Sequence, residues 1–229
     1  NIEKSDDGYK ATMDSPSQGA KGIPVEKVSL DNNKLEIKMP KLQIEYQGAC
    51  FGDELIIGTF KQAGIALPLN LTKSKTAIVI NRPQEPKEPF PYHSEEVTFI
   101  NSKENITLAG TLTLPKNEGK FPAVILISGS GPQNRNEEIF GHKPFFVLAD
   151  YLTRNGIAVL RFDDRGVGKS TGDFSKATTA NFATDVEAAV EFLMSRKEIN
   201  SKKIGLIGHS EGGIIAPMVV ANSKDVSFI

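Results

Sequence analysis

The sequence predicts an α/β fold, a doubly wound and mostly parallel sheet that is incomplete, preceded by a small all-β domain. Three observations lead to this prediction. Residues 9–73 alternate apolar and polar side chains with a period of two, a proline-rich segment follows, and continuous apolar runs then alternate with helical periods. We expect an all-β domain over residues 1–82, a linker over residues 83–94 and the amino-terminal part of an α/β domain over residues 95–229.

Composition excludes several classes of function. The 229 residues include 27 basic and 28 acidic side chains, for a net charge of -1, and no basic footprint for nucleic acid is visible. No apolar run reaches the length of a membrane span. The chain begins at Asn1 with a run of mostly polar residues, so we expect a mature or trimmed chain whose export signal is not included. Cys50 is the single cysteine and is predicted to pack as a small apolar residue in a strand.

The first domain shows the pattern of half-buried antiparallel strands. Alternation is clearest over three short stretches, 35–39, 42–46 and 67–71. Turn residues separate the strands: Asp31-Asn32-Asn33, Gly52-Asp53 and Ala63-Gly64. No helical period of useful length is present, so the domain is predicted to be a sheet or a partial barrel.

The linker is predicted from its prolines. Residues 83–94 contain Pro83, Pro86, Pro89 and Pro91, a spacing that favours an extended, semi-rigid connector. The boundary between the two domains is therefore placed here.

The second domain opens with two strand-like stretches, 97–100 and 106–114, which predict a hairpin. Beyond them, buried strands alternate with helical stretches, which predicts a parallel sheet with helices on both faces. The expected buried strands cover residues 121–128, 157–162 and 203–208, with a further strand from Val226. The expected helices run from Pro144 to Gly156, along the face of Phe182, Val186, Ala189, Val190 and Leu193, and from Gly212.

Gly208-His209-Ser210-Glu211-Gly212 fits the pattern of a nucleophile elbow, in which a serine lies at the apex of a tight strand-to-helix turn. Glycines are needed on either side because Cβ atoms there would collide with the neighbouring strand and helix. A buried strand is predicted to end at Gly208 and an apolar helix to begin at Gly212, which is the context that the motif requires. We therefore predict that Ser210 is a catalytic nucleophile; the alternative is a glycine-rich turn without chemistry.

Two loops are predicted to complete the site. Ser128-Gly129-Ser130-Gly131 follows a buried strand, and an acyl-transfer enzyme needs a second backbone N–H there to pair with that of Glu211 around the oxyanion. Ser130 is the predicted donor, with a neighbouring residue or an ordinary flexible loop as alternatives. The charges of residues 161–170, RFDDRGVGKS, are predicted to build an ion pair that shapes the site. This stretch is not a phosphate loop, because the first glycine of that motif would fall on Asp163.

From about residue 97 to residue 229 the chain resembles the α/β-hydrolase superfamily. Its GHSEGG and RFDDRGVGKS are similar to the serine aminopeptidase-like and dienelactone-hydrolase-like branch, and the β-rich leader resembles an accessory module of bacterial, often exported, members. The resemblance implies an eight-stranded, mostly parallel sheet, hydrolysis of esters or related acyl bonds, no cofactor and no metal, and a periplasmic or extracellular location. It carries over only Ser210, Glu211 and the loop of residues 128–131.

The rest of a catalytic triad is not predicted within this chain. In this fold the acid and then the histidine follow the nucleophile, but only a short segment follows Ser210. His93 lies in the linker, and the side chain of His209 must diverge from that of Ser210. His142 remains as an alternative base, against a role in the wall of the site. The acidic residues of the loop after residue 162 and of the following helix precede the nucleophile and so do not match the acid of the family: Asp163, Asp164, Asp173 and Asp185.

We therefore expect a truncated chain whose carboxyl-terminal segment is missing or is a second polypeptide. Alone, it is expected to lack catalysis at the level of a triad. The leading function is a serine carboxylesterase that forms an acyl-enzyme on Ser210. The alternatives are a serine peptidase acting on short peptides, or a catalytically inert, hydrolase-like binding protein. The sequence predicts neither the substrate, the lid nor the oligomeric state.

Overall fold

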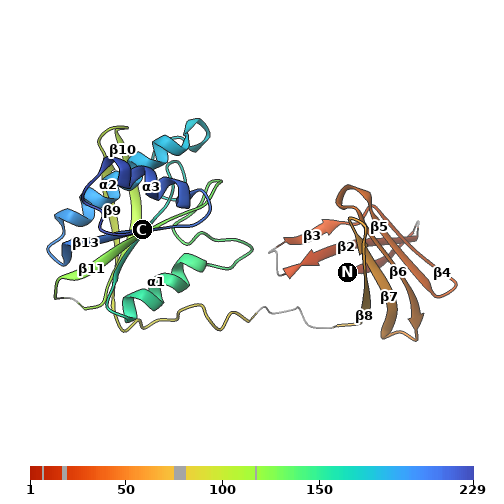
Figure 1. Ribbon diagram of the computed structural model, residues 1–229. Coiled ribbons are helices and arrows are strands. Elements are labelled where there is room, and N and C mark those ends of the chain that lie inside the picture. The colour runs from red at the N-terminus through yellow and green to blue at the C-terminus, as the bar shows by residue number, and fades with distance from the viewer. Residues whose placement is uncertain (7, 17–19, 75–80, 117) are drawn as a thin grey trace. The chain divides into compact units, whose positions relative to one another are not determined.

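The computed structural model describes residues 1–6, 8–16, 20–74, 81–116 and 118–229. The chain divides into two compact units, Asn1–Asn81 and Arg82–Ile229 (Figure 1). Each unit has its own hydrogen-bonded sheets, and each is described by itself. Independent folding of residues 1–82 stays a prediction.

The described residues of the first unit form two antiparallel sheets. The strands β1 (Ile2–Ser5), β2 (Gly8–Ser15) and β3 (Ala20–Pro24) make one sheet. The other sheet runs in chain order: β4 (Lys27–Asp31), β5 (Lys34–Met39), β6 (Ile44–Phe51), β7 (Leu55–Gln62) and β8 (Ile65–Thr72). A short 3₁₀ turn, Pro40–Leu42, joins β5 to β6. The predicted all-β character is confirmed.

The period-two pattern places apolar side chains on one face of the five-stranded sheet. Leu35, Met39, Ile44 and Tyr46 are buried there. The Tyr46 ring lies over Gly58, where a Cβ atom would be 2.4 Å from the Tyr46 hydroxyl oxygen. That hydroxyl donates a hydrogen bond of 3.1 Å to the Leu69 carbonyl. The aromatic side chain thus covers backbone that a glycine leaves bare.

The turns of this sheet follow from residues that tolerate left-handed backbone. Asn32 and Asn33 join β4 to β5 with φ of 44° and 60°, and Ala63 and Gly64 join β7 to β8 with φ of 48° and 85°. Such two-residue connections match the twist of the strands that they join. Cys50 lies half-buried in β6 as a free cysteine.

The second unit has a mixed sheet in the order β13-β11-β12-β10-β9. Its bounds are β9 (His93–Asn101), β10 (Ile106–Leu114), β11 (Phe121–Ile127), β12 (Ala158–Phe162) and β13 (Ile199–Gly208). The strands β13, β11 and β12 are parallel, whereas β10 is antiparallel to both of its neighbours. The predicted leading hairpin and the buried parallel strands are confirmed.

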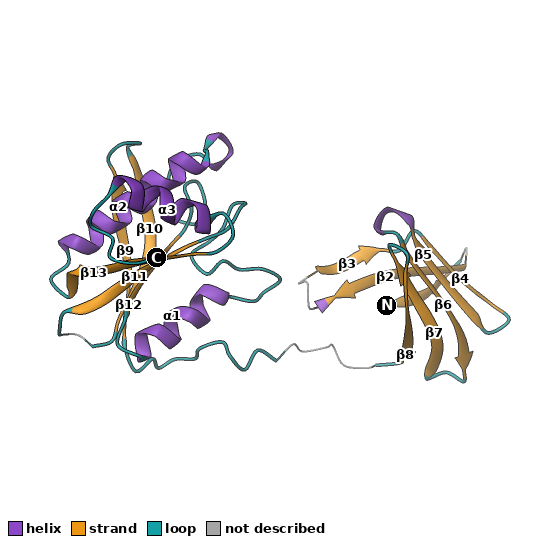
Figure 2. Ribbon diagram, viewed as in Figure 1, coloured by secondary structure: helices purple, strands orange, loops and turns teal. Residues whose placement is uncertain are grey.

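Helices cover both faces of this sheet (Figure 2). Helix α1 (Pro144–Arg154) packs against Val124, Leu126 and Val159 on one face. Helices α2 (Thr179–Ser195) and α3 (Gly212–Asn222) pack on the other face, where the alternate strand residues Ile125 and Leu160 belong to the larger core. Strand residues point to opposite faces in turn, so strands that are apolar throughout can hold helices on both sides.

The strand predicted from Val226 is smaller than expected. Phe228 makes a single parallel bridge to Gly205, with hydrogen bonds from Ser227 N to the Ile204 carbonyl, 2.7 Å, and from Leu206 N to the Phe228 carbonyl, 3.1 Å. The Phe228 ring lies where a Cβ atom of Gly205 would be. One bridge fixes the position of Phe228 beside β13 but does not make a ladder.

The proline-rich segment packs on the second unit. Tyr92 is buried, and its hydroxyl donates a hydrogen bond of 2.9 Å to Asp150 of α1. Phe90 stacks on the Tyr92 ring, and Lys143 pairs with Glu85 at 2.6 Å. Residues 83–92 are thus held against the second unit beside helix α1.

No described helix is long and apolar enough to cross a membrane.

Candidate active site

The elbow is built by two glycines that allow backbone segments to touch. Strand β13 ends at Gly208, Ser210 has a left-handed φ of 53°, and α3 begins at Gly212. A Cβ atom on Gly208 would lie 2.1 Å from the Gly212 carbonyl oxygen, and one on Gly212 would lie 2.3 Å from the Ile127 carbonyl oxygen. Either side chain would force the backbone apart. Ser210 is therefore held at the apex of a turn that larger residues cannot form.

Ser210 is exposed at this apex, beside the amino end of α3. Within the described residues, its hydroxyl makes no hydrogen bond, and the N–H of Glu211 donates to no acceptor. The Glu211 carboxylate accepts a hydrogen bond of 2.7 Å from Thr179 Oγ1, so it is engaged at the start of α2. The amino end of a helix favours negative charge, which is the charge that develops on a carbonyl oxygen under nucleophilic attack.

The loop of residues 128–131 lies against the elbow. His209 N donates a hydrogen bond of 3.0 Å to the Ile127 carbonyl, and the Cβ position of Gly129 is 3.1 Å from Ser210 Cβ. Ser130 is exposed, and among the described residues its N–H has no acceptor. Ser210, Glu211 and Ser130 are thus brought to one edge of the sheet from two different strand ends.

Glu137 is a buried residue of this site that the sequence did not point to. Its Oε1 atom accepts a hydrogen bond from Gly129 N at 2.7 Å and lies 2.7 Å from Nδ1 of His209. The His209 side chain therefore turns toward Glu137, in agreement with the expectation that it diverges from Ser210. No local motif marks Glu137, because its partners are distant in sequence.

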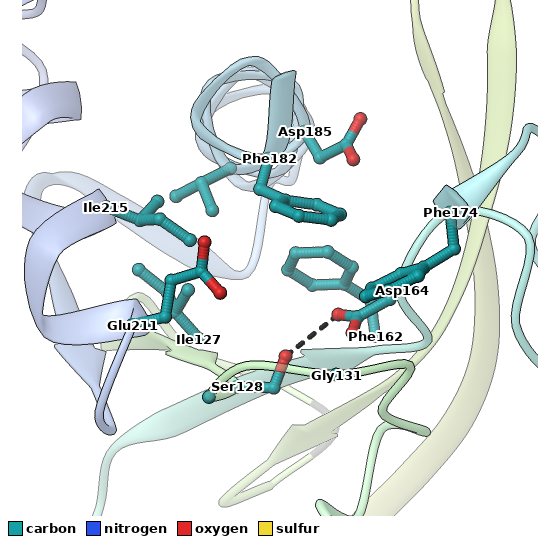
Figure 3. Close-up of a pocket in the computed structure, with 12 residues that line it drawn as sticks. Ile127, Ser128, Gly131, Phe162, Asp164, Phe174, Phe182, Asp185, Glu211 and Ile215 are labelled. Atoms are coloured by element: carbon teal, nitrogen blue, oxygen red, sulfur yellow. Dashed lines mark hydrogen bonds between the residues drawn. The ribbon is translucent and has the colours of Figure 1, made fainter. Parts of the chain in front are cut away.

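Asp164 holds the same loop from the other side. One carboxylate oxygen accepts a hydrogen bond of 2.8 Å from Ser128 Oγ (Figure 3), and the other accepts one of 2.9 Å from Gln133 N. Burial raises the pKa of Asp164 to about 6, although these two hydrogen bonds act to lower it. The sequence pointed to the charged stretch around Asp164, but the ionisation of this group depends on burial that only the fold reveals.

The neighbouring charges form the predicted ion pairs. Asp163 accepts from the backbone and the guanidinium of Arg135, with an Nη2–Oδ2 distance of 2.8 Å. Burial acts to raise the pKa of Asp163, but the hydrogen bonds from Arg135 and Lys169 and the charge of Arg135 together outweigh it, and the pKa is lowered. Arg165 pairs with Asp185 of α2 at 2.8 Å. These pairs tie the loop after β12 to the loop after β11 and to α2.

A small pocket lies under the loop of residues 128–131. Its volume is about 20 Å³, room for a single water molecule, and both phenylalanine rings and carboxyl groups are among its lining residues (Figure 3). The residues that line it are Ile127, Ser128, Gly129, Gly131, Phe162, Asp164, Phe174, Phe182, Asp185, Val186, Glu211 and Ile215.

No described histidine or carboxylate forms a hydrogen bond with Ser210. His142 exchanges backbone hydrogen bonds of 2.9 Å with Ile139, and His93 begins β9. Asp185 accepts from Asn101 at 2.7 Å as well as from Arg165, and Asp173 binds Ser175 in a short turn. In the described ranges, no three His, Cys, Asp or Glu side chains are arranged to hold a metal ion.

The second unit has the α/β-hydrolase fold, which the solved structures of similar proteins share. The family model for serine aminopeptidase, S33, matches residues 143–228. The match includes α1, the loop after β12, α2, β13 and the whole elbow.

Relatives support the same assignment. The chain is 34% identical to Esterase EstD of Thermotoga maritima over 137 residues, covering 60% of this chain and 31% of the relative. It is 29% identical to the uncharacterized protein PA2218 of Pseudomonas aeruginosa over 190 residues, covering 80% and 49%. The second unit makes up less than two thirds of this chain, so the PA2218 match extends into the first unit. The chain spans less than half the length of either relative.

Solved structures share the fold. The structure of PA2218 superimposes with a TM-score of 0.52 at 29% identity, covering 66% of this chain and 46% of that chain. The Pyrococcus furiosus esterase Pf2001 gives a TM-score of 0.50 at 25% identity, covering 64% and 55%.

Proposed function

We propose that this protein is a serine hydrolase that cleaves ester bonds through an acyl-enzyme on Ser210. The observation that carries the proposal is the position of Ser210. It lies at the apex of a turn with φ of 53°, next to the unbonded N–H of Glu211 and to the loop that carries Ser130. An exposed hydroxyl beside two free backbone donors is the arrangement that acyl transfer needs.

In the proposed reaction, Ser210 Oγ attacks the carbonyl carbon of an ester. The electron pair of the C=O bond moves to the oxygen, where the N–H groups of Glu211 and Ser130 stabilise the negative charge. The C–O bond to the alcohol then breaks, and the alcohol leaves with a proton. Water attacks the acyl-enzyme in the same way and releases the acid and Ser210.

A base must take the proton from Ser210, and no described side chain is bonded to that hydroxyl. We infer that a histidine and its acid partner are supplied by a segment of the protein that this chain does not include. The lengths of the relatives support this inference, since the chain covers 31% of EstD and 49% of PA2218. His142 as a substitute base finds no support in its hydrogen bonds.

A peptidase that acts on short peptides is the second candidate, because the matching family model is that of a serine aminopeptidase. The same nucleophile and oxyanion donors serve amide bonds. The full-length protein should be assayed on p-nitrophenyl acetate and on aminoacyl p-nitroanilides. Faster turnover of the ester is expected; a clear preference for the anilides would favour the peptidase.

Ser210→Ala tests the nucleophile in the full-length protein. Turnover of the p-nitrophenyl ester is expected to fall by roughly a thousandfold or more, the scale of a lost triad nucleophile. Ser201→Ala is the matched control, because Ser201 is an exposed serine of the same strand, β13, and should leave turnover unchanged. Wild-type turnover by Ser210→Ala would mean that Ser210 is not the nucleophile, whereas no turnover in the full-length wild-type protein would favour an inert binding protein.

A further inference from the structure

Glu137 joins two elements that the proposed chemistry must hold in register. One oxyanion donor, Glu211 N, follows β13, whereas the other, Ser130 N, follows β11. Glu137 Oε1 lies 2.7 Å from Gly129 N, next to Ser130, and 2.7 Å from His209 Nδ1, next to Ser210. A single carboxylate oxygen of Glu137 thus contacts both the residue that precedes Ser130 and the residue that precedes Ser210.

The chemistry of a carboxylate fixes the direction of both bonds. An ionised carboxylate can only accept, so Nδ1 of His209 carries a hydrogen and donates it to Glu137. Hydrogen bonds that involve a charged group are shorter and stronger than neutral ones, and both of these are 2.7 Å. Glu137 is buried, with the side chain 9% exposed, which protects both bonds from competition by water.

The backbone of Glu137 is itself held in place. Glu137 has a left-handed φ of 50°, which is uncommon for a residue with a side chain. Its N–H donates to the Asn134 carbonyl at 2.8 Å, and the nearby Arg135 N donates to Asp163 Oδ1 at 2.9 Å. The carboxylate therefore extends from a turn that the buried Asp163–Arg135 pair anchors.

Gly129 permits the close approach on which the contact depends. Its Cβ position is 3.3 Å from Glu137 Oε1, 3.3 Å from His209 Nδ1 and 3.1 Å from Ser210 Cβ. Asp164 accepts from Ser128 Oγ, before Ser130 in the loop, and from Gln133 N, after it. Ser130 is left between anchored neighbours, although its own N–H is bonded to no described residue.

We propose that Glu137 is a positioning residue that clamps the loop of residues 128–131 to the elbow and so fixes the distance between the two oxyanion donors. The proposal rests on the proposed function of Ser210. Oxyanion donors must lie about 2.7–3.1 Å from the developing charge, and a misplacement of about 1 Å can cost about a hundredfold in rate. A clamp that acts on position should affect the transition state more than substrate binding.

The test compares Glu137→Ala, Glu137→Gln and Glu138→Ala in the full-length protein. For Glu137→Ala, kcat is expected to fall between about tenfold and a hundredfold, with KM within about twofold. In Glu137→Gln, the oxygen of the new side-chain amide can still accept both hydrogen bonds, so this variant should recover most of the loss. Glu138 is the exposed neighbour and makes no hydrogen bond to a described residue, so Glu138→Ala should behave as wild type.

His209→Ala tests the same clamp from its exposed end, where the side chain is 68% exposed and its loss should spare folding. It should lower kcat in the same way, and the double variant should lose less than the product of the single losses, because both act through one contact. Affinity for a trifluoromethyl ketone, which forms an oxyanion on Ser210, should fall in parallel with kcat/KM.

Any of three results would overturn the proposed clamp. The first is a wild-type kcat in both Glu137→Ala and His209→Ala, and the second is no recovery of kcat in Glu137→Gln. The third is an equal effect on kcat and on 1/KM while the affinity for the ketone is unchanged. If Glu137→Ala does not fold, His209→Ala decides alone. Failure of the proposed function is a separate result, since the wild-type protein and Ser210→Ala would then show the same turnover.

Discussion

Asp164 illustrates how a single residue at this site responds to its surroundings. Burial raises the pKa of Asp164 to about 6, and the nearby Asp185 and Asp163 act in the same direction, while the bonds from Gln133 and Ser128 oppose it. The ordinary pKa of the group is 3.8. The folded state therefore keeps a proton that the unfolded chain has already lost between these two pH values.

This shift has a defined consequence for stability. Between about pH 4 and pH 6, the unfolded chain binds fewer protons at this group than the folded chain, so the contribution of Asp164 to stability falls as pH rises. Asp164→Asn removes this ionisation. The free energy of unfolding of the variant, relative to that of wild type, should shift in favour of the variant by roughly 2 kcal/mol between pH 4 and pH 7.

Urea unfolding at the two pH values measures this difference. Asp173→Asn is the control, because the hydrogen bond from Ser175 lowers the pKa of the exposed Asp173. A lowered pKa contributes stability that is present at high pH and lost as pH falls, so this variant should shift in the opposite direction. If the free energy of unfolding of Asp164→Asn differs from that of wild type by the same amount at pH 4 and at pH 7, the raised pKa is contradicted.

At the residue scale, the sequence predicts what a local motif encodes. Ser210 and Glu211 follow from the glycines around them, and Ser130 follows from its place after a buried strand. Glu137 could not be predicted, because Gly129 and His209 meet it only after β11 and β13 pair.

At the element scale, the elbow depends on the contact between α3 and the end of β11. Gly212→Ala would place a Cβ atom 2.3 Å from the Ile127 carbonyl oxygen. We expect a loss of about 1–3 kcal/mol or more in the free energy of unfolding, the usual cost of overpacking, together with lower turnover as Ser210 is displaced.

Gly213→Ala is the matched control for this prediction. The adjacent glycine has its nearest atom, the Gly208 carbonyl oxygen, at 3.8 Å, so a methyl group fits. Within a helix, the change from Gly to Ala should stabilise by up to about 1 kcal/mol. Thermal unfolding of the two variants should therefore move in opposite directions; equal shifts would mean that the glycine contact does not build the elbow.

The elements themselves were predicted where a period or a continuous apolar run was long. The hairpin of β9 and β10, the parallel strands and the three helices follow such patterns. The length of the strand from Val226 was overestimated, because a run of apolar residues alone does not specify how many backbone hydrogen bonds form beside β13. The three-stranded sheet of β1, β2 and β3 was not separated from the five-stranded sheet, because both share the period of two.

At the scale of the whole molecule, the two units differ in how they connect sequence to function. The second unit places Ser210, Glu211 and Ser130 at one edge of a sheet covered on both faces. The described part of the first unit carries no residue of the candidate site. The sequence match to PA2218 covers 80% of this chain and so reaches into the first unit.

The most direct test of the central claim is the site of covalent labelling in the full-length protein. A fluorophosphonate probe reacts with an activated serine, and tryptic cleavage after Lys203 and Lys224 isolates residues 204–224, which contain Ser210. Mass spectrometry should locate one adduct, on Ser210, and Ser210→Ala should remain unlabelled. An adduct on another residue, or undiminished labelling of Ser210→Ala, would contradict the assignment of Ser210 as the nucleophile.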